Sequence, residues 1–230
     1  MILSWPQCVA LAKQYGADAE TQTEIEHMAK LAEEKGWWED YKGGMPPKFQ
    51  MFVAMEAEAD RILTFEAETV TGLFQTEAYT RTVCLKIPFR EEEKILQLVR
   101  LRKDRQNGVL SGDHVPVIKF VLTEGALLRQ VGGKEAHAEQ LRKLLESAKL
   151  PNIDIRVLTN ESGEYASMEG SFTVLEFDNP EDPDTVYLES RDGCRYVEAA
   201  DRVRTFRTVL QSMFEQAMPV EEFLHAKGLA

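Results

Sequence analysis

The sequence has 230 residues, of which 43% are hydrophobic, enough for one large globular domain with its own core. Its formal net charge of -12 repels phosphate backbones and argues against direct nucleic-acid binding by this chain. No run of about 18 apolar residues predicts a membrane span. The N-terminus also lacks the basic flank and apolar block of a signal peptide, so we expect a cytoplasmic protein.

The cysteines and histidines predict neither a metal centre nor a catalytic triad. Cys8, Cys84 and Cys194 are odd in number and far apart, so we expect no disulfide framework and no zinc site. The four histidines fall on different predicted elements, without the spacing of a metal motif. We therefore expect no metal and no cofactor.

Residues 1–47 predict a small helical appendage followed by a linker. The segments 4–15 and 21–35 have the apolar spacing of helices, and a glycine follows each of them. Aromatic residues and the pairs Gly-Gly and Pro-Pro then occupy 37–47, which marks a boundary. A separate main domain is expected at 48–230.

The main domain begins with a helix, a strand and a second helix. A helix at about 49–61 places Glu56 beside apolar side chains on one face. Alternating residues over 64–70 favour a half-buried strand, and a glycine break and a helix follow. Gln75 and Tyr79 are four residues apart, so we expect their polar tips on one face of that helix.

The rest of the domain predicts further helices and strands. Helices are expected at 91–106, 124–129, 134–148, 199–218 and 221–225. Strands are expected at 115–122, 153–158, 171–177 and 185–189. Runs of strands after runs of helices favour the α+β class, with a mixed or antiparallel sheet of about 4–5 strands packed with helices.

Three carboxylates lie beside apolar residues on their predicted elements, where an unpaired charge is costly. They are Glu56, Glu124 and Glu189. We therefore expect each carboxylate to have a partner, and the available arginines are Arg105, Arg129 and Arg156. Such pairs are explained by structure as readily as by a ligand pocket.

Several segments, taken in order, resemble one known family. They are 36–38, 55–59, 70–79, 105–106, 123–129, 131–133, 140–141, 152–158, 170–172 and 186–189. Residues 71–76 read Thr-Gly-Leu-Phe-Gln-Thr, where the family has Pro-Gly-Leu-Leu-Gln-Thr. The order and spacing are similar to the C-terminal domain, of unassigned biochemical function, of WhiJ-like actinobacterial regulators with a Cro/repressor-type (XRE) helix-turn-helix. The similarity covers about residues 36–218, and residues 1–35 are too short and acidic to form the DNA-binding module that precedes it.

The resemblance implies a ligand-sensing or protein-interaction domain that controls DNA binding by a transcriptional regulator. A small-molecule effector or a small acidic partner protein would act on it, and the domain would be a homodimer. We expect the pocket between the sheet and the helix of Gln75 and Tyr79. Its expected ligand-binding residues are Glu56, Gln75, Tyr79, Arg105, Glu124, Arg129, Tyr187 and Glu189.

Two other classes of function stay open. An enzyme could reuse this domain, with Glu124 or Glu189 as general base and an arginine holding a small anionic substrate. A pure protein-interaction domain would instead use the aromatic cluster at 37–41 as an exposed anchor. The sequence names neither the ligand nor the partner.

Overall fold

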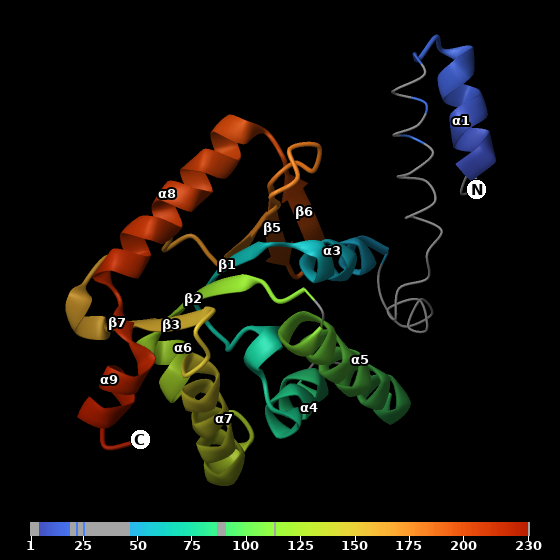
Figure 1. Ribbon diagram of the computed structural model, residues 1–230. Coiled ribbons are helices and arrows are strands. Elements are labelled where there is room, and N and C mark those ends of the chain that lie inside the picture. Colours follow the sequence, from blue (N-terminus) through green and yellow to red (C-terminus); the bar gives the residue numbers. More distant parts are fainter. Residues whose placement is uncertain are drawn as a thin grey trace. The chain divides into compact units, whose positions relative to one another are not determined.

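The computed structural model describes residues 5–18, 22, 25, 47–86, 91–112 and 114–229 (Figure 1). The chain divides into two compact units, Met1–Asp40 and Tyr41–Ala230. Helix α1 (Trp5–Gln14) belongs to the first unit. The helix expected at 21–35 falls outside the described residues apart from Gln22 and Ile25, and the aromatic cluster at 37–41 falls wholly outside them.

In the described part of the second unit, a seven-stranded mixed sheet forms the centre. Its strands, in spatial order, are β6 (Gly193–Val197), β5 (Thr185–Ser190), β4 (Phe172–Glu176), β1 (Arg61–Glu66), β2 (Val117–Thr123), β3 (Ile153–Leu158) and β7 (Met218–Pro219). Strands β1, β2 and β3 are parallel, and Ile118 pairs with Ile62 on one side and with Ile153 on the other. Strands β4, β5 and β6 form an antiparallel meander beside β1. The expected α+β class and mixed sheet are confirmed, with more strands than expected.

Most helices cover one face of this sheet. They are α3 (Pro47–Glu58), α4 (Glu77–Leu85), α5 (Glu92–Ser111), α6 (Glu124–Leu128), α7 (Gly133–Ala148) and α9 (Val220–Ala226). Their apolar side chains share a core with Ile62, Phe120 and Ile155 of the parallel strands. Side chains alternate along a strand, so the neighbouring residues Leu63 and Val121 point to the opposite face.

Helix α8 (Ala200–Gln216) covers the opposite face (Figure 1). Its Leu210 and Met213 are buried against Phe65, Val174 and Val186 of the sheet. Because helices lie on both faces, the central strands are buried on two sides and contain few polar residues. Within the described ranges, no helix combines the length and apolar character that crossing a membrane requires.

The chain leaves β1 through a tightly bonded loop. A single 3-10 turn, η2 (Gly72–Phe74), precedes α4, whose first turn is capped by the Thr76 side chain accepting from the Tyr79 amide at 3.2 Å. The Tyr79 hydroxyl accepts from the Val70 amide at 3.2 Å. Gln75 lies in this loop in an extended conformation. The expectation that Gln75 and Tyr79 share one helix face is therefore wrong, because Thr76 starts the helix after Gln75.

Two element boundaries also differ from expectation. Strand β1 starts at Arg61 and ends at Glu66, whereas the alternating pattern predicts 64–70. Residues 193–197, for which the sequence predicts no strand, form the edge strand β6, where Tyr196 pairs with Tyr187 of β5. Two further short elements, the 3-10 helix η3 (Asn160–Ser162) and strand β7, are absent from the sequence-based prediction.

Candidate functional site

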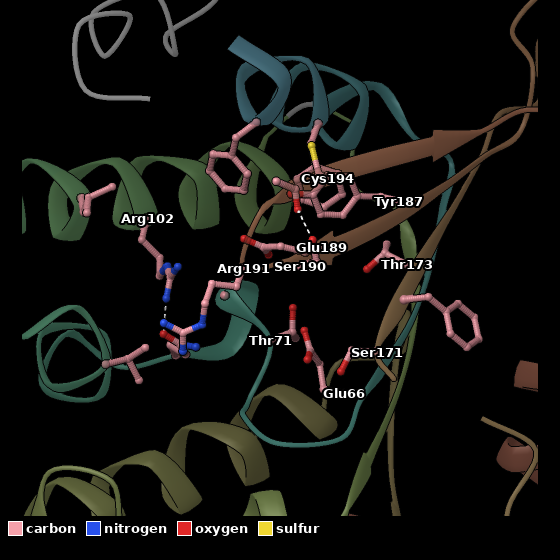
Figure 2. A pocket seen from close by; sticks show the side chains of 18 of the residues that line it. Glu66, Thr71, Arg102, Ser171, Thr173, Tyr187, Glu189, Ser190, Arg191 and Cys194 are labelled. Atoms are coloured by element: carbon pink, nitrogen blue, oxygen red, sulfur yellow. Dashed lines mark hydrogen bonds between the residues drawn. The ribbon is translucent and has the colours of Figure 1, made fainter. Parts of the chain in front are cut away.

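A cavity of about 770 Å³ lies at one end of the sheet (Figure 2). The carboxyl ends of β1 and β5 and the amino ends of β4 and β6 meet there, and α3, α4, α5 and η2 supply the remaining walls. This volume lies inside the range of about 300–1,000 Å³ that small-molecule sites occupy. The site is thus built from segments scattered between Phe49 and Cys194.

A buried ion pair supports the wall formed by α3 and α5. Arg105 donates to both carboxylate oxygens of Glu56, with Nη2 at 2.6 Å from Oε1. Only 6% of the Arg105 side chain and 1% of the Glu56 side chain are exposed. The Arg105 guanidinium lies 5.2 Å from the centre of the Phe52 ring, and Phe52 stacks on Tyr187 at 4.1 Å. These contacts link α5, α3 and β5 into one rigid wall.

Arg102, one helical turn before Arg105, also lines the cavity. Its guanidinium donates to Oε1 of Gln75. Among the described residues, no carboxylate forms an ion pair with Arg102. Burial and the neighbouring charge of Arg105 lower the pKa of Arg102. Arg102 is therefore a partly buried cation held by a neutral amide.

Glu66, the last residue of β1, lies on the sheet side of the cavity. Figure 2 shows it with Ser171 on that side, while Arg102 lies on the side of α5. Burial raises the pKa of Glu66 to about 7, a hydrogen bond from Ser171 lowers it, and the charge of Glu189 raises it. The Ser171 hydroxyl accepts from the Ala67 amide at 3.0 Å, which orients it beside the carboxyl group. Glu66 can therefore gain or lose a proton near neutral pH.

Six of the eight expected ligand-binding residues lie at or next to this cavity. Gln75, Arg105, Tyr187 and Glu189 line it. Glu56 stands behind the wall as the partner of Arg105. Tyr79, in the first turn of α4, is buried against the loop after β1, where its hydroxyl accepts from the Val70 amide.

Glu124 and Arg129 lie away from the cavity. The Glu124 carboxylate accepts from the Asn160 amide at 2.8 Å and pairs with Lys227 at 2.9 Å. The backbone hydrogen bond from Asn160 and the contact with Lys227 lower the Glu124 pKa. Arg129 pairs with the exposed Glu68 at 2.8 Å. The arginine partner expected for Glu124 is thus replaced by a lysine from the C-terminal helix.

Of the other residues expected to form ion pairs, two pair with each other and two do not pair as expected. Glu56 and Arg105 pair as expected. Arg156 pairs instead with its neighbour Asp154 at 3.2 Å. Glu189 is exposed and forms no ion pair with a described residue.

Sequence reasoning missed Glu66 and Arg102, for different reasons. The pattern at 64–70 treats Glu66 as a solvent-facing strand residue, although it shares the parity of Ile62 and so faces the helices. Arg102 belongs to a basic helix end, which the helix dipole explains without a ligand. Alternation counted from the true start of β1 at Arg61 would have placed Glu66 on the face that the helices cover. No local signal singles out Arg102 among its neighbours.

A comparison with known protein families assigns the chain to one of them. A family model described as "Domain of unknown function (DUF5753)" matches residues 49–225. The chain belongs to this family. Every residue that lines the cavity falls inside the DUF5753 segment. No curated protein matches the chain.

Proposed function

We propose that this DUF5753 chain is a ligand-sensing domain of a transcriptional regulator, in which a small molecule occupies the cavity at the end of the sheet. The observation that carries the proposal is a cavity of about 770 Å³ with ionisable groups converging on it from three strands and a helix. A pocket that combines apolar walls with a few placed polar groups is the usual form of a small-molecule site.

The walls supply both kinds of contact that such a ligand needs. Phe49, Phe52 and Tyr187 present aromatic surface to the cavity, which favours a flat or apolar part of a ligand. Glu66 and Arg102 supply an acid and a cation with no ion-pair partner in the described part of the chain. A ligand that satisfies these groups would stabilise this arrangement of strands and helices over any other that binds it less tightly.

The regulatory part of the proposal is supported by the resemblance of residues 36–218 to the C-terminal domain of XRE, WhiJ-like regulators. On that basis the occupied cavity would control DNA binding, with the domain acting as a homodimer or through a small acidic partner protein. Sedimentation equilibrium at micromolar concentration tests the homodimer directly. A monomer at every concentration and ligand condition would contradict it.

A matched pair of variants on α5 tests cavity occupancy. Leu98 lines the cavity, whereas Leu96 is 41% exposed on the same helix and does not line it. We expect a fractionated small-molecule extract of the source cells to raise the melting temperature of wild type and Leu96→Trp, because a bound ligand stabilises the folded state. Leu98→Trp puts a larger side chain on the cavity wall and should reduce this response. An equal response in both variants would place the ligand elsewhere.

Glu66 also supports a second candidate, an enzyme of this family that uses Glu66 as general acid or base. A carboxyl group with a pKa of about 7 is suited to proton transfer near neutral pH. Of the two bases proposed from the sequence, Glu124 is ion-paired with Lys227 and Glu189 lines the cavity. If the bound molecule is turned over, Glu66→Gln should abolish turnover while retaining binding. Chemically unchanged ligand recovered from wild type favours sensing.

A further inference from the structure

We propose that the ligand of this cavity carries an anionic group, a carboxylate or a phosphate, and that Arg102 binds it. The inference rests on the proposed function for the claim that a ligand is present, and it adds the ligand's chemical class. It stands on the contacts of Arg102 and on the shape of the loop that faces it.

Arg102 and Arg105 lie on the same face of α5 and differ in one respect. The charge of Arg105 is balanced by Glu56, which accepts from Nε and Nη2. Arg102 donates only to Gln75 within the described residues. A guanidinium has five donors, and a partly buried cation without a countercharge is costly. The pair therefore consists of one arginine with a bound countercharge and one without, whose remaining donors are available to a ligand.

The Gln75 side chain is a neutral amide, so it cannot supply the missing negative charge, and its other polar atoms are also engaged. Its amide nitrogen donates to the Val70 carbonyl at 2.6 Å, and its oxygen also accepts from the Thr80 hydroxyl at 3.2 Å. The Gln75 carbonyl of the main chain accepts from Gln106 at 2.9 Å and from Lys143 at 2.9 Å. This network fixes Gln75 and, through it, one nitrogen of Arg102. The guanidinium is thus oriented before a ligand arrives.

Gly72 brings the backbone directly against the two guanidinium groups. A Cβ atom at this position would lie 2.8 Å from Arg105 Nη1 and 3.4 Å from Arg102 Nε. The absence of a side chain at Gly72 therefore leaves space for both guanidinium groups beside the cavity. A bidentate anion such as a carboxylate or phosphate matches the planar fork of a guanidinium.

The acidic groups of the cavity do not replace this anion. Glu66 lies across the cavity beside Ser171 (Figure 2). Neither Glu66 nor Glu189 forms an ion pair with Arg102 in the described part of the chain. A ligand with its anionic group on Arg102 and a hydrogen-bonding group near Glu66 would span the cavity. Both unpaired groups would then be satisfied by one molecule.

Anion titrations followed by NMR test the inference, with the arginine Nε–H signals as readout. Inorganic phosphate and acetate are added separately at constant ionic strength, so the two arms distinguish phosphate from carboxylate recognition. In wild type we expect the Arg102 signal to shift and saturate with at least one anion. Arg102→Gln should weaken binding about tenfold or more, since charge-assisted bonds are lost. Arg100→Gln, an exposed position on the same helix, should change it less than about twofold.

The wild-type signal decides the matter even if Arg102→Gln does not fold, and Arg102→Lys gives a second, charge-conserving variant. Lysine keeps the charge but loses the fork, so intermediate affinity is expected. An Arg102 signal unmoved by both anions, or equal binding by wild type and Arg102→Gln, overturns the inference. If an extract still stabilises Arg102→Gln as much as wild type, the anion class is wrong and the sensing proposal stands. If the anions bind through Arg102 but no extract fraction stabilises the protein, the anion-binding inference stands and the sensing proposal is wrong.

Discussion

Glu66 and Arg102 bring a carboxyl group and a guanidinium cation to one cavity, and no ion pair between them is formed in the described part of the chain. Each is held by a neutral partner, Ser171 for Glu66 and Gln75 for Arg102. Proteins place such groups in their interiors at a cost in stability, and functional sites are where that cost is commonly found. At the scale of single residues, the cavity therefore differs from the ion pair behind it, where Glu56 and Arg105 satisfy each other.

Glu66 should make stability depend on pH. Its folded-state pKa of about 7 lies above the ordinary glutamate pKa of 4.5. The folded protein therefore binds the proton more tightly, and the free energy of unfolding falls as pH rises from about 4.5 to 7. Glu66→Gln removes this penalty and should be more stable than wild type by about 2 kcal/mol at pH 8, with the difference vanishing near pH 4.5.

Urea denaturation at pH 5 and pH 8 measures this difference. The control is Glu68→Gln, because Glu68 is exposed and pairs only with the exposed Arg129 among the described residues. Its effect on stability should be small and should not follow the same pH profile. A Glu66→Gln variant that is less stable than wild type at pH 8 would show that the ionised carboxylate is favoured in the folded state.

The Glu56 and Arg105 pair should contribute strongly to stability. Glu56→Gln leaves a buried guanidinium without its countercharge, so we expect a loss of about 3 kcal/mol or more. Glu58→Gln, an exposed position on the same helix, should change the free energy of unfolding by less than about 0.5 kcal/mol. Chemical denaturation at neutral pH compares the two. Equal effects would mean that the buried pair is replaceable by a neutral hydrogen bond.

At the scale of elements, the turn η2 fixes where the arginines of α5 lie. Gly72→Ala places a Cβ 2.8 Å from Arg105 Nη1, and the bidentate contact with Glu56 prevents Arg105 from moving away freely. We expect a loss of about 1–2 kcal/mol in the free energy of unfolding, together with weaker anion binding at Arg102. The denaturation midpoint and the phosphate titration report the two effects.

Gly125→Ala is the matched control for this change. Its added Cβ would meet the Thr123 hydroxyl at 3.7 Å, an ordinary contact, and alanine favours the helical conformation of α6. Its stability should be unchanged or slightly higher. If Gly72→Ala also leaves stability and anion binding unchanged, the turn does not position the arginines.

Elements with a regular pattern of apolar residues could be predicted from the sequence. Elements that form only by pairing with another strand could not. The apolar stripe of α8 and the alternation of β3 are properties of the local sequence, so the prediction matches them closely. Strand β6 has the sequence Gly-Cys-Arg-Tyr-Val and becomes a strand because it pairs with β5. Gln75 was placed on a helix because local sequence does not reveal that Thr76 caps α4.

At the scale of the whole molecule, the cavity follows from strand order. Strand β4 lies next to β1 on the side opposite β2, which brings Ser171 beside Glu66 across about a hundred residues of sequence, as the Ala67 to Ser171 hydrogen bond shows. The sequence predicted the class of fold, and four of the eight site residues expected from it line the cavity. It could not predict Glu66 with Arg102, because nothing local specifies which strands become neighbours.

The central claim is that the cavity holds a small molecule, and native mass spectrometry of the purified protein, read beside its denatured mass, tests it most directly. We predict that wild type and Leu96→Trp, incubated with the small-molecule extract, carry the same stoichiometric excess mass. Leu98→Trp should carry less of it, because its larger side chain narrows the cavity. An excess as large on Leu98→Trp as on wild type, or none on wild type under any extract fraction, would contradict the claim.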